Sequence, residues 1–269
     1  MRVYISADME GTAGVTGILQ TMPAEKQYDA ARSLMIAEVN AAIEGAFQGG
    51  ATEVRVNDSH DGMRNLLLDA LDPRAELVSG APKPLSMVEG IEAGFDVMLC
   101  TGYHSMAGSA GTLAHTYNGL VHTSRLCGRP VGELGLNAAY AGLLGVPVGL
   151  VTGDDVLQKE TAEIVPWAKF ALVKWAASRY AARNLSHARA CEEITKGAEA
   201  AVRGAKQMQV FTLPGRPEVE VTFLNAAQAG LAALCPGSER TSPLSVRFAH
   251  DDYREVFKAF RAMITLARD

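Results

Sequence analysis

The chain has 269 residues, of which 48% are hydrophobic and 20% are charged, and its formal net charge at pH 7 is −5. These values are typical of a soluble globular protein with one large domain, or with one large and one small domain. The negative balance argues against nucleic acids and anionic membrane surfaces as partners, because both favour basic faces. The apolar stretches are broken by polar residues before they reach the length of a membrane span.

The N-terminus and the cysteines bear on where the protein works. The first residues lack an apolar segment followed by a small-residue cleavage site, so we expect no signal peptide. The four cysteines show no CxxC spacing, which argues against a zinc knuckle or a redox pair and favours buried free thiols. Together these features predict a cytoplasmic location.

Most of the chain alternates between predicted strands and predicted helices. Short apolar runs bounded by turn residues predict strands, and apolar positions at helical spacing predict helices. The expected strands are 3–7, 53–57, 76–79, 96–101, 148–152 and 170–173. The expected helical segments are 24–48, 66–71, 87–93, 131–144, 156–165 and 186–206. This order favours an α/β fold, with a mostly parallel sheet flanked by helices.

Two regions depart from this alternation. Residues 103–130 are rich in Gly, Ser, Thr and His, which is typical of a functional loop, with room for a hairpin of strands 120–123 and 125–127. The final part predicts a smaller α+β portion, with strands 218–223 and 244–248 and helices 226–234 and 252–267. We therefore expect two domains, a catalytic metal-binding α/β domain over residues 1–206 and a smaller α+β domain over residues 207–269.

Acids and histidines follow several of the predicted strands. Asp8 and Glu10 follow the first strand, His60 follows the second, and His104 follows the strongly apolar strand near residue 100. Glu133 lies near the start of the helix after the long loop. In open α/β sheets, ligands bind beyond the carboxyl ends of the strands, so we expect these five side chains to meet there.

The residue types indicate a metal centre. Two histidines and three carboxylates suit zinc, and five ligands fit two metals that share a bridging carboxylate better than one tetrahedral zinc. Asp8 and Glu10 are two residues apart in an extended segment, so both can face one cluster. We expect Gly11 to let the backbone turn away sharply. Magnesium or manganese with phosphoester chemistry is the competing interpretation.

Each residue also has an ordinary structural interpretation. Acids after strands are commonly helix caps or turn residues, a histidine near a core is commonly hydrogen-bonded, and Glu133 suits the dipole of its helix. Asp154 and Asp155 fit a helix N-cap and a role in orienting a histidine equally well, and Asp58 also suits the second role. The convergence on one sheet edge is what favours the metal centre.

Ordered motifs over the first 155 residues point to a family. They are SADMEG at 6–11, VNDSH at 56–60, PLSMVEG at 84–90, GYH at 102–104, RPVGELGLN at 129–137 and GDD at 153–155. Together they resemble the DppA-type family of zinc-dependent D-aminopeptidases, which are self-compartmentalising enzymes. Weaker similarity continues to the C-terminus.

The resemblance implies two Zn²⁺ ions per subunit. Asp8 would bridge both metals, Glu10 and His104 would complete one site, and His60 and Glu133 would complete the other. These are the same five residues that the strand ends indicate.

The resemblance also implies a catalytic histidine, which maps onto His115. This residue lies in the long loop, away from any strand end, which suits a group that does not bind metal. It would act as a general acid or base, polarise the scissile carbonyl, or act as a nucleophile. His122 is a weaker candidate, and we expect His187 and His250 to be structural or at the surface.

The implied function is that of an aminopeptidase. It would hydrolyse the N-terminal residue from short peptides, with D-amino-acid-containing peptides such as D-Ala-D-Ala as expected substrates, by attack of a metal-bridging hydroxide. The resemblance further implies a homodecamer of two five-membered rings. We expect the loop 105–118 to line the substrate pocket.

Two alternatives from other classes are a dinuclear metal phosphoesterase and a non-catalytic, metal-stabilised binding or assembly protein. The lack of a Gly-rich phosphate loop counts against the phosphoesterase. A binding protein would have no need of an unligated His115 beside the metals.

Overall fold

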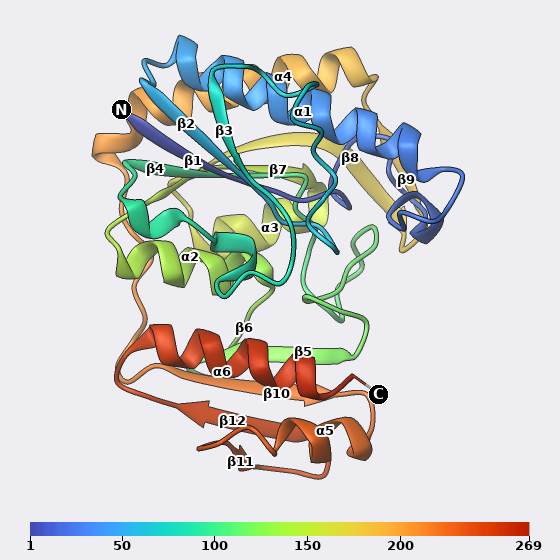
Figure 1. The fold of residues 1–269 in the computed structure, drawn as a ribbon, viewed down its shortest axis with the longest axis vertical. Helices are drawn as coiled ribbons and strands as arrows, with labels where there is room; N and C mark the ends of the chain where they lie inside the picture. Colours follow the sequence, from blue (N-terminus) through green and yellow to red (C-terminus); the bar gives the residue numbers. More distant parts are fainter. Residues whose placement is uncertain (269) are drawn as a thin grey trace.

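The computed structural model describes residues 1–268, and a seven-stranded sheet forms its larger part (Figure 1). The strand order is β3-β2-β1-β4-β7-β8-β9. The strands are β1 (Arg2–Ala7), β2 (Glu53–Asp58), β3 (Ala75–Val78), β4 (Val97–Thr101), β7 (Val148–Asp154), β8 (Lys169–Ser178) and β9 (Ala181–Asn184). All neighbours pair in parallel except β8 and β9, which are antiparallel. The predicted α/β fold with a mostly parallel sheet is confirmed.

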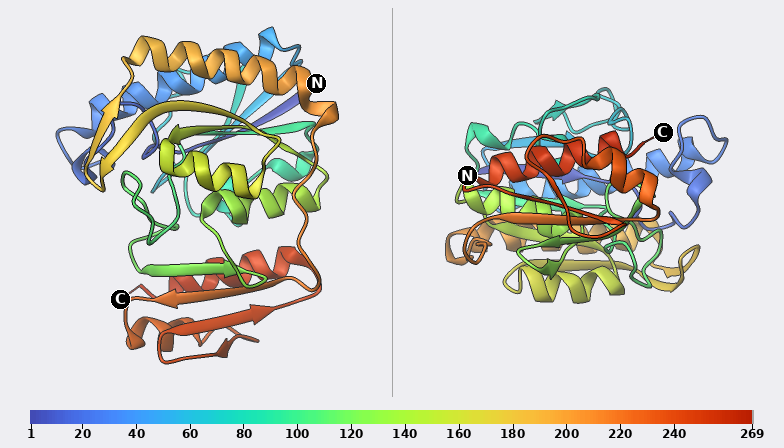
Figure 2. Two further views of the ribbon diagram at one scale, coloured as in Figure 1. Left: turned by 180° about the vertical axis from the view of Figure 1, so that it is seen from behind. Right: turned by 90° about the horizontal axis from the view of Figure 1, so that it is seen from below.

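Helices cover both faces of this sheet (Figures 1 and 2). The helices α1 (Tyr28–Gln48) and α4 (His187–Gly204) pack together on one face, and α2 (Glu133–Leu143) and α3 (Asp155–Ile164) lie on the other. The helix α1 connects the parallel strands β1 and β2, α3 connects β7 and β8, and α2 leads into β7, whereas α4 leads from β9 toward the second sheet.

Alternation along β1 supplies two separate cores. Val3 and Ile5 join the core under α1 and α4, whereas Tyr4 joins the core that includes α2 and α3. Successive side chains of a strand point to opposite faces, so a strand that is apolar throughout requires helices on both sides. Each fully buried aliphatic side chain contributes about 1.5–3 kcal/mol relative to exposure.

A second sheet of five strands, in the order β11-β12-β10-β5-β6, lies beyond α2 (Figures 1 and 2). Its strands, all antiparallel, are β5 (Val121–Leu126), β6 (Arg129–Pro130), β10 (Glu218–Phe223), β11 (Glu239–Arg240) and β12 (Ser245–Ala249). The helices α5 (Ala226–Ala232) and α6 (Tyr253–Leu266) pack against it, and α6 also contacts α2. This sheet is the smaller α+β portion, and the two proposed domains, 1–206 and 207–269, share it through β5 and β6.

Three predicted local elements differ from the structure, the third being the helical segment 87–93 described below. Residues 66–71 are not helical, because side chains bind their main chain instead: Asp58 accepts from the Leu66 N–H at 2.8 Å, and Asn40 donates to the Ala70 carbonyl at 2.9 Å. The strand β5 runs unbroken through residue 124, and the hairpin turn lies at Cys127 and Gly128, which both have positive φ.

Four short 3₁₀ helices complete the described elements: η1 (Ile18–Gln20), η2 (Ser86–Val88), η3 (Ile91–Ala93) and η4 (Ala205–Gln207). The predicted helical segment 87–93 therefore consists of two such turns separated by Glu89 and Gly90. Within residues 1–268, no helix combines the length and apolar character that crossing a membrane requires.

Candidate metal centre

Three neighbouring strands and one helix place five buried side chains together. Asp8 and Glu10 follow β1, His60 follows β2, His104 follows β4, and Glu133 is the first residue of α2. None of the five is more than 5% exposed. Buried ionisable groups are costly unless they are paired or bind a cation, so this cluster requires a chemical explanation.

A close approach of two loops brings β1 and β4 residues together. The Gly11 N–H donates to the Gly102 carbonyl at 2.7 Å. A Cβ atom on Gly11 would lie 1.9 Å from the Tyr103 carbonyl oxygen, and one on Gly102 would lie 2.1 Å from the Asp8 carbonyl oxygen. The φ of Gly11 is outside the left-handed region, so this contact, and not a sharp turn, requires a glycine there.

Asp8 lies between the two histidines. One of its oxygens, Oδ1, is 3.3 Å from His60 Nδ1, and the other, Oδ2, is 3.5 Å from His104 Nε2. His60 Nδ1 is also 2.9 Å from Glu10 Oε2, and His104 Nε2 is also 3.5 Å from Glu133 Oε2. This is the arrangement that a carboxylate shared by two cations would need.

Main-chain carbonyls orient all three histidines of the cluster. The pairs are His60 Nε2 with Thr21 O at 2.8 Å, His104 Nδ1 with Ser105 O at 3.1 Å, and His115 Nδ1 with Leu113 O at 2.8 Å. A carbonyl oxygen only accepts, so in each neutral imidazole the proton lies on this outer nitrogen. The inner nitrogen then offers its lone pair, as in metal sites whose histidines are held by outer partners.

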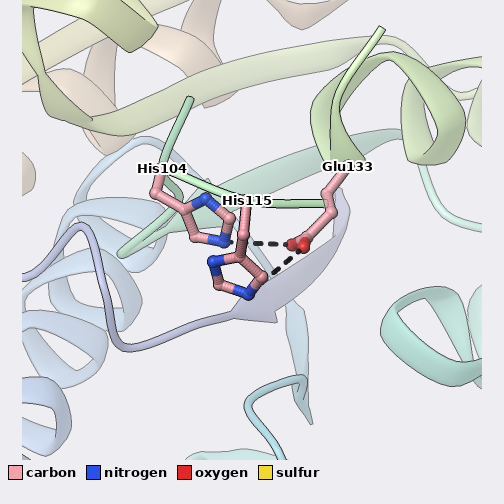
Figure 3. Close-up of side chains that lie close together, drawn as sticks. All are labelled: His104, His115 and Glu133. Carbon is pink, nitrogen blue, oxygen red and sulfur yellow. Dashed lines mark ion pairs between the residues drawn. The ribbon is translucent and has the colours of Figure 1, made fainter. Parts of the chain in front are cut away.

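His115 stacks on His104 beside Glu133 (Figure 3). The ring centroids are 4.1 Å apart and the planes differ by 13°. His115 Nε2 lies 3.9 Å from Glu133 Oε1, which also accepts a hydrogen bond from the Tyr117 N–H at 2.6 Å. The long loop thus carries a third histidine to the cluster from outside the strand ends.

The other three histidines lie outside this cluster. His122 and His250 are exposed, and their hydrogen-bond partners are Thr123 and Asp252. His187 is half-buried beside the Leu34 carbonyl.

The residues present fit a metal ion. Ligand atoms of Asp8, Glu10 and His104 lie within 4.8 Å of one another, and so do those of His104, His115 and Glu133. Glu10 Oε2 and His104 Nε2 are buried and have no well-aligned hydrogen-bond partner among the described residues. Buried polar atoms without a hydrogen-bond partner are rare in native proteins, and a bound cation would supply the missing partner. This mixture of nitrogen and oxygen donors suits zinc.

Burial and neighbouring charges shift the pKa of every group in the cluster. Burial and the charge of Glu10 raise the pKa of Asp8 to about 8. Burial opposes the charged form of His104, but Glu133 and Asp8 outweigh it and raise its pKa to about 10. Burial and the charge of His104 lower the pKa of His115. Without a cation the cluster therefore retains protons, which metal binding would release.

The structure shows the hydrogen-bond partners of Asp154, Asp155 and Asp58, the three acids whose roles the sequence analysis left open. Asp154 both caps α3, through the Leu157 N–H at 2.9 Å, and accepts from the Thr112 N–H at 2.8 Å, three residues before His115. Asp155 accepts from the Ala176 N–H, and Asp58 binds Asn65 and Leu66 in place of a histidine ring.

Sequence reasoning missed two buried charged residues near the cluster. Glu160 of α3 accepts from the Met106 N–H at 2.9 Å and the Gly132 N–H at 3.2 Å, next to Glu133. Lys174 of β8 is completely buried. The signal for Lys174 was a lone lysine inside an apolar strand, whereas a glutamate in an amphipathic helix such as α3 carries no distinctive signal.

Comparisons with known proteins agree with this geometry. Residues 1–262 match the peptidase M55 family, described as D-aminopeptidase. The chain is 40% identical over 268 residues to a D-aminopeptidase of Bacillus subtilis (strain 168), covering 99% of this chain and 98% of that protein. It also matches the solved structure of the Zn-dependent D-aminopeptidase DppA from Bacillus subtilis, described as a self-compartmentalizing protease. That match has a TM-score of 0.96 and 39% identity, and covers 99% of this chain and 98% of the other. The chain belongs to the M55 family of D-aminopeptidases, and it is a hydrolase that acts on peptide bonds.

Proposed function

We propose that this protein is a dinuclear zinc aminopeptidase that releases the N-terminal residue of short peptides, with D-amino-acid-containing peptides such as D-Ala-D-Ala as substrates. The observation that carries the proposal is the position of Asp8, with one carboxylate oxygen toward His60 and the other toward His104. The Zn dependence of the Bacillus subtilis relative supports the choice of metal. Family membership favours this function over the phosphoesterase and the non-catalytic binding protein.

The five buried donors would hold the two ions. Asp8 would serve both, and Glu10, His60, His104 and Glu133 would complete the two sites. Zinc bound here would polarise the scissile carbonyl and lower the pKa of an attacking water. The outer carbonyl partners of the histidines keep the inner nitrogens directed at the centre, which limits reorganisation on binding.

We propose that His115 is the general acid and base. Its Nδ1 is engaged by the Leu113 carbonyl, so Nε2 is the atom available to a substrate. Burial and the neighbouring His104 lower the pKa of His115, which favours the neutral ring that can accept a proton. The same atom would then return that proton to the leaving amine.

The test is turnover with and without metal. D-Ala-D-Ala, L-Ala-L-Ala and p-nitrophenyl phosphate are each offered to the zinc-loaded and the chelator-treated protein. We expect hydrolysis of the D-dipeptide, restored after chelation by zinc, and no phosphatase activity. A chelator-treated protein that cleaves D-Ala-D-Ala at the original rate would overturn the proposal.

His115→Ala separates chemistry from metal binding. We expect about a 10²–10⁴-fold loss of turnover with both metals retained, because the side chain transfers protons and does not hold an ion. His122→Ala is the matched control, since His122 is exposed in the same stretch of chain. Equal activity of the two variants would remove His115 from the reaction.

We further propose a ring-shaped homodecamer that encloses the active sites. The relative described as a self-compartmentalizing protease supports this assembly. Several large apolar side chains are exposed on the single chain, among them Ile18, Met22 and Leu68, as expected of surfaces that neighbouring subunits cover. Light scattering should give ten times the mass of the chain.

A further inference from the structure

Lys174 is a fully buried lysine that binds main chain and no carboxylate in the described part of the chain. It lies on β8 with 0% exposure. Its Nζ donates to the carbonyls of Glu10, Thr12 at 3.2 Å and Val15 at 2.7 Å. All three acceptors belong to the loop that leaves β1 with Glu10, which we call the 10–15 loop.

The contacts match an ammonium group. A protonated lysine has three N–H donors and no acceptor, and three carbonyls receive them here. A neutral amine has only two N–H donors, so its lone pair would face one of the three carbonyl oxygens and repel it. The site is therefore built for a positive charge, beside a cluster with three carboxylates.

Two further side chains bind the same loop from other elements. Glu38 of α1 accepts from the Ala13 N–H at 2.8 Å, and Asn184 of β9 accepts from the Gly14 N–H at 2.9 Å. The 10–15 loop contains no helix or strand of its own, so these side chains satisfy much of its main chain. Its conformation thus depends on β8, β9 and α1.

Burial of a lysine without a carboxylate partner is expensive in free energy, whereas an apolar side chain of the same length would fill the space without that cost. The position of the Lys174 ammonium group, at the loop that carries Glu10, indicates its role. Glu10 belongs to this loop and its carboxylate lies 2.9 Å from His60 Nδ1 in the cluster, so the position of the loop sets the position of the carboxylate.

We propose that Lys174 is a positioning residue that holds the 10–15 loop so that the Glu10 carboxylate stays in the metal centre, and that it thereby strengthens binding of the ion that Glu10 serves. This inference rests on the proposed dinuclear function. Among residues 1–268, the Lys174 ammonium hydrogen-bonds to main-chain carbonyls only, so its role is to position Glu10 and not to act on the substrate.

The experiment measures zinc binding without peptide. Lys174→Met is compared with Lys169→Met, the same substitution at an exposed position on the same strand, by competition with a chromophoric chelator. We expect one of the two zinc dissociation constants to rise by about 10–100-fold in Lys174→Met, as for other residues that support metal ligands, and the other to change little. Lys169→Met should match the original protein.

A purely structural lysine would give a different pattern. Equal weakening of both sites, or unchanged zinc binding with a lower melting temperature of the metal-free protein, would overturn the proposal. If Lys174→Met does not fold, Asn184→Ala decides, because its exposed side chain binds the same loop. We expect that variant to weaken one zinc site by a few-fold, and unchanged binding would overturn the proposal. Tight zinc binding by a protein that hydrolyses no peptide would contradict the proposed function and leave this inference standing.

Discussion

The two sheets of this molecule differ in what lies at the ends of their strands. In the seven-stranded sheet, β1, β2 and β4 run in parallel and are followed by Asp8, Glu10, His60 and His104. In the five-stranded sheet, neighbouring strands run in opposite directions, and none of the five candidate ligands lies on it. Parallel strands present all their carboxyl ends at one edge, whereas antiparallel strands divide them between two edges.

The second sheet acts on the centre through packing. Its helix α6 lies against α2, and the Tyr253 hydroxyl donates to the Leu136 carbonyl at 2.9 Å. Glu133 begins α2, so this contact supports the helix that carries one candidate ligand, and the second sheet supplies none of the five. Changes at the parallel edge should therefore affect chemistry directly, and surface changes on the second sheet should not.

The largest effect is expected for Asp8→Ala. Because Asp8 is proposed to serve both ions, this variant should lose both metals, and its activity should fall by more than the roughly 10–100-fold that changes to supporting residues produce. Metal content by mass spectrometry and turnover of D-Ala-D-Ala measure both effects. Glu220→Ala on β10 is the control in the second sheet and should leave both unchanged. An Asp8→Ala protein with full metal content and activity would contradict the comparison.

A smaller effect, loss of a single ion, is expected for Glu10→Ala. The family resemblance pairs Glu10 with His104, yet among residues 1–268 His60 is the histidine closest to Glu10, at 2.9 Å. When two residues bind the same ion, the metal losses caused by substituting each of them do not add. A double variant therefore shows which two residues bind the same ion. Adding His104→Ala to Glu10→Ala should remove no further metal, whereas adding His60→Ala should remove the second ion. The opposite result would assign His60 to the same ion as Glu10.

The sequence predicted the parallel edge well because its signals are local. An apolar run followed by Asp8 and Glu10 indicates both a buried strand and acids at its end. The pairing of β5 with β10 had no local signal, because the paired residues are 93 (Leu126 with Val219) to 102 (Val121 with Phe223) positions apart in the chain and only tertiary contacts select them. Lys174 could not be assigned a role either, because its partners are carbonyls of an irregular loop. The helix expected at 66–71 was wrong because Asp58 and Asn40 compete for the main chain.

The smallest expected effect is on how the free energy of unfolding depends on pH, through Glu38, which binds the 10–15 loop together with Lys174. Burial raises the pKa of Glu38 to about 8, although the Ala13 N–H and Lys174 oppose this shift. Between its ordinary pKa of 4.5 and about 8, the folded protein thus holds a proton that the unfolded chain lacks. The free energy of unfolding must then fall as pH rises through this window, by at most about 1.4 kcal/mol per pH unit.

Glu38→Gln should remove this contribution, because an amide does not titrate. Urea unfolding of the metal-free protein at pH 5 and pH 9 should show that the variant gains stability relative to the original protein at the higher pH, since Asp8 and His104 titrate in both proteins and cancel in the comparison. Glu220→Gln changes a half-buried acid of the second sheet, far from the 10–15 loop in the fold, and should give the same difference from the original protein at both pH values. If the Glu38→Gln difference is also independent of pH, then Glu38 is ionised in the folded protein across the window, and the 10–15 loop is held by two opposite charges.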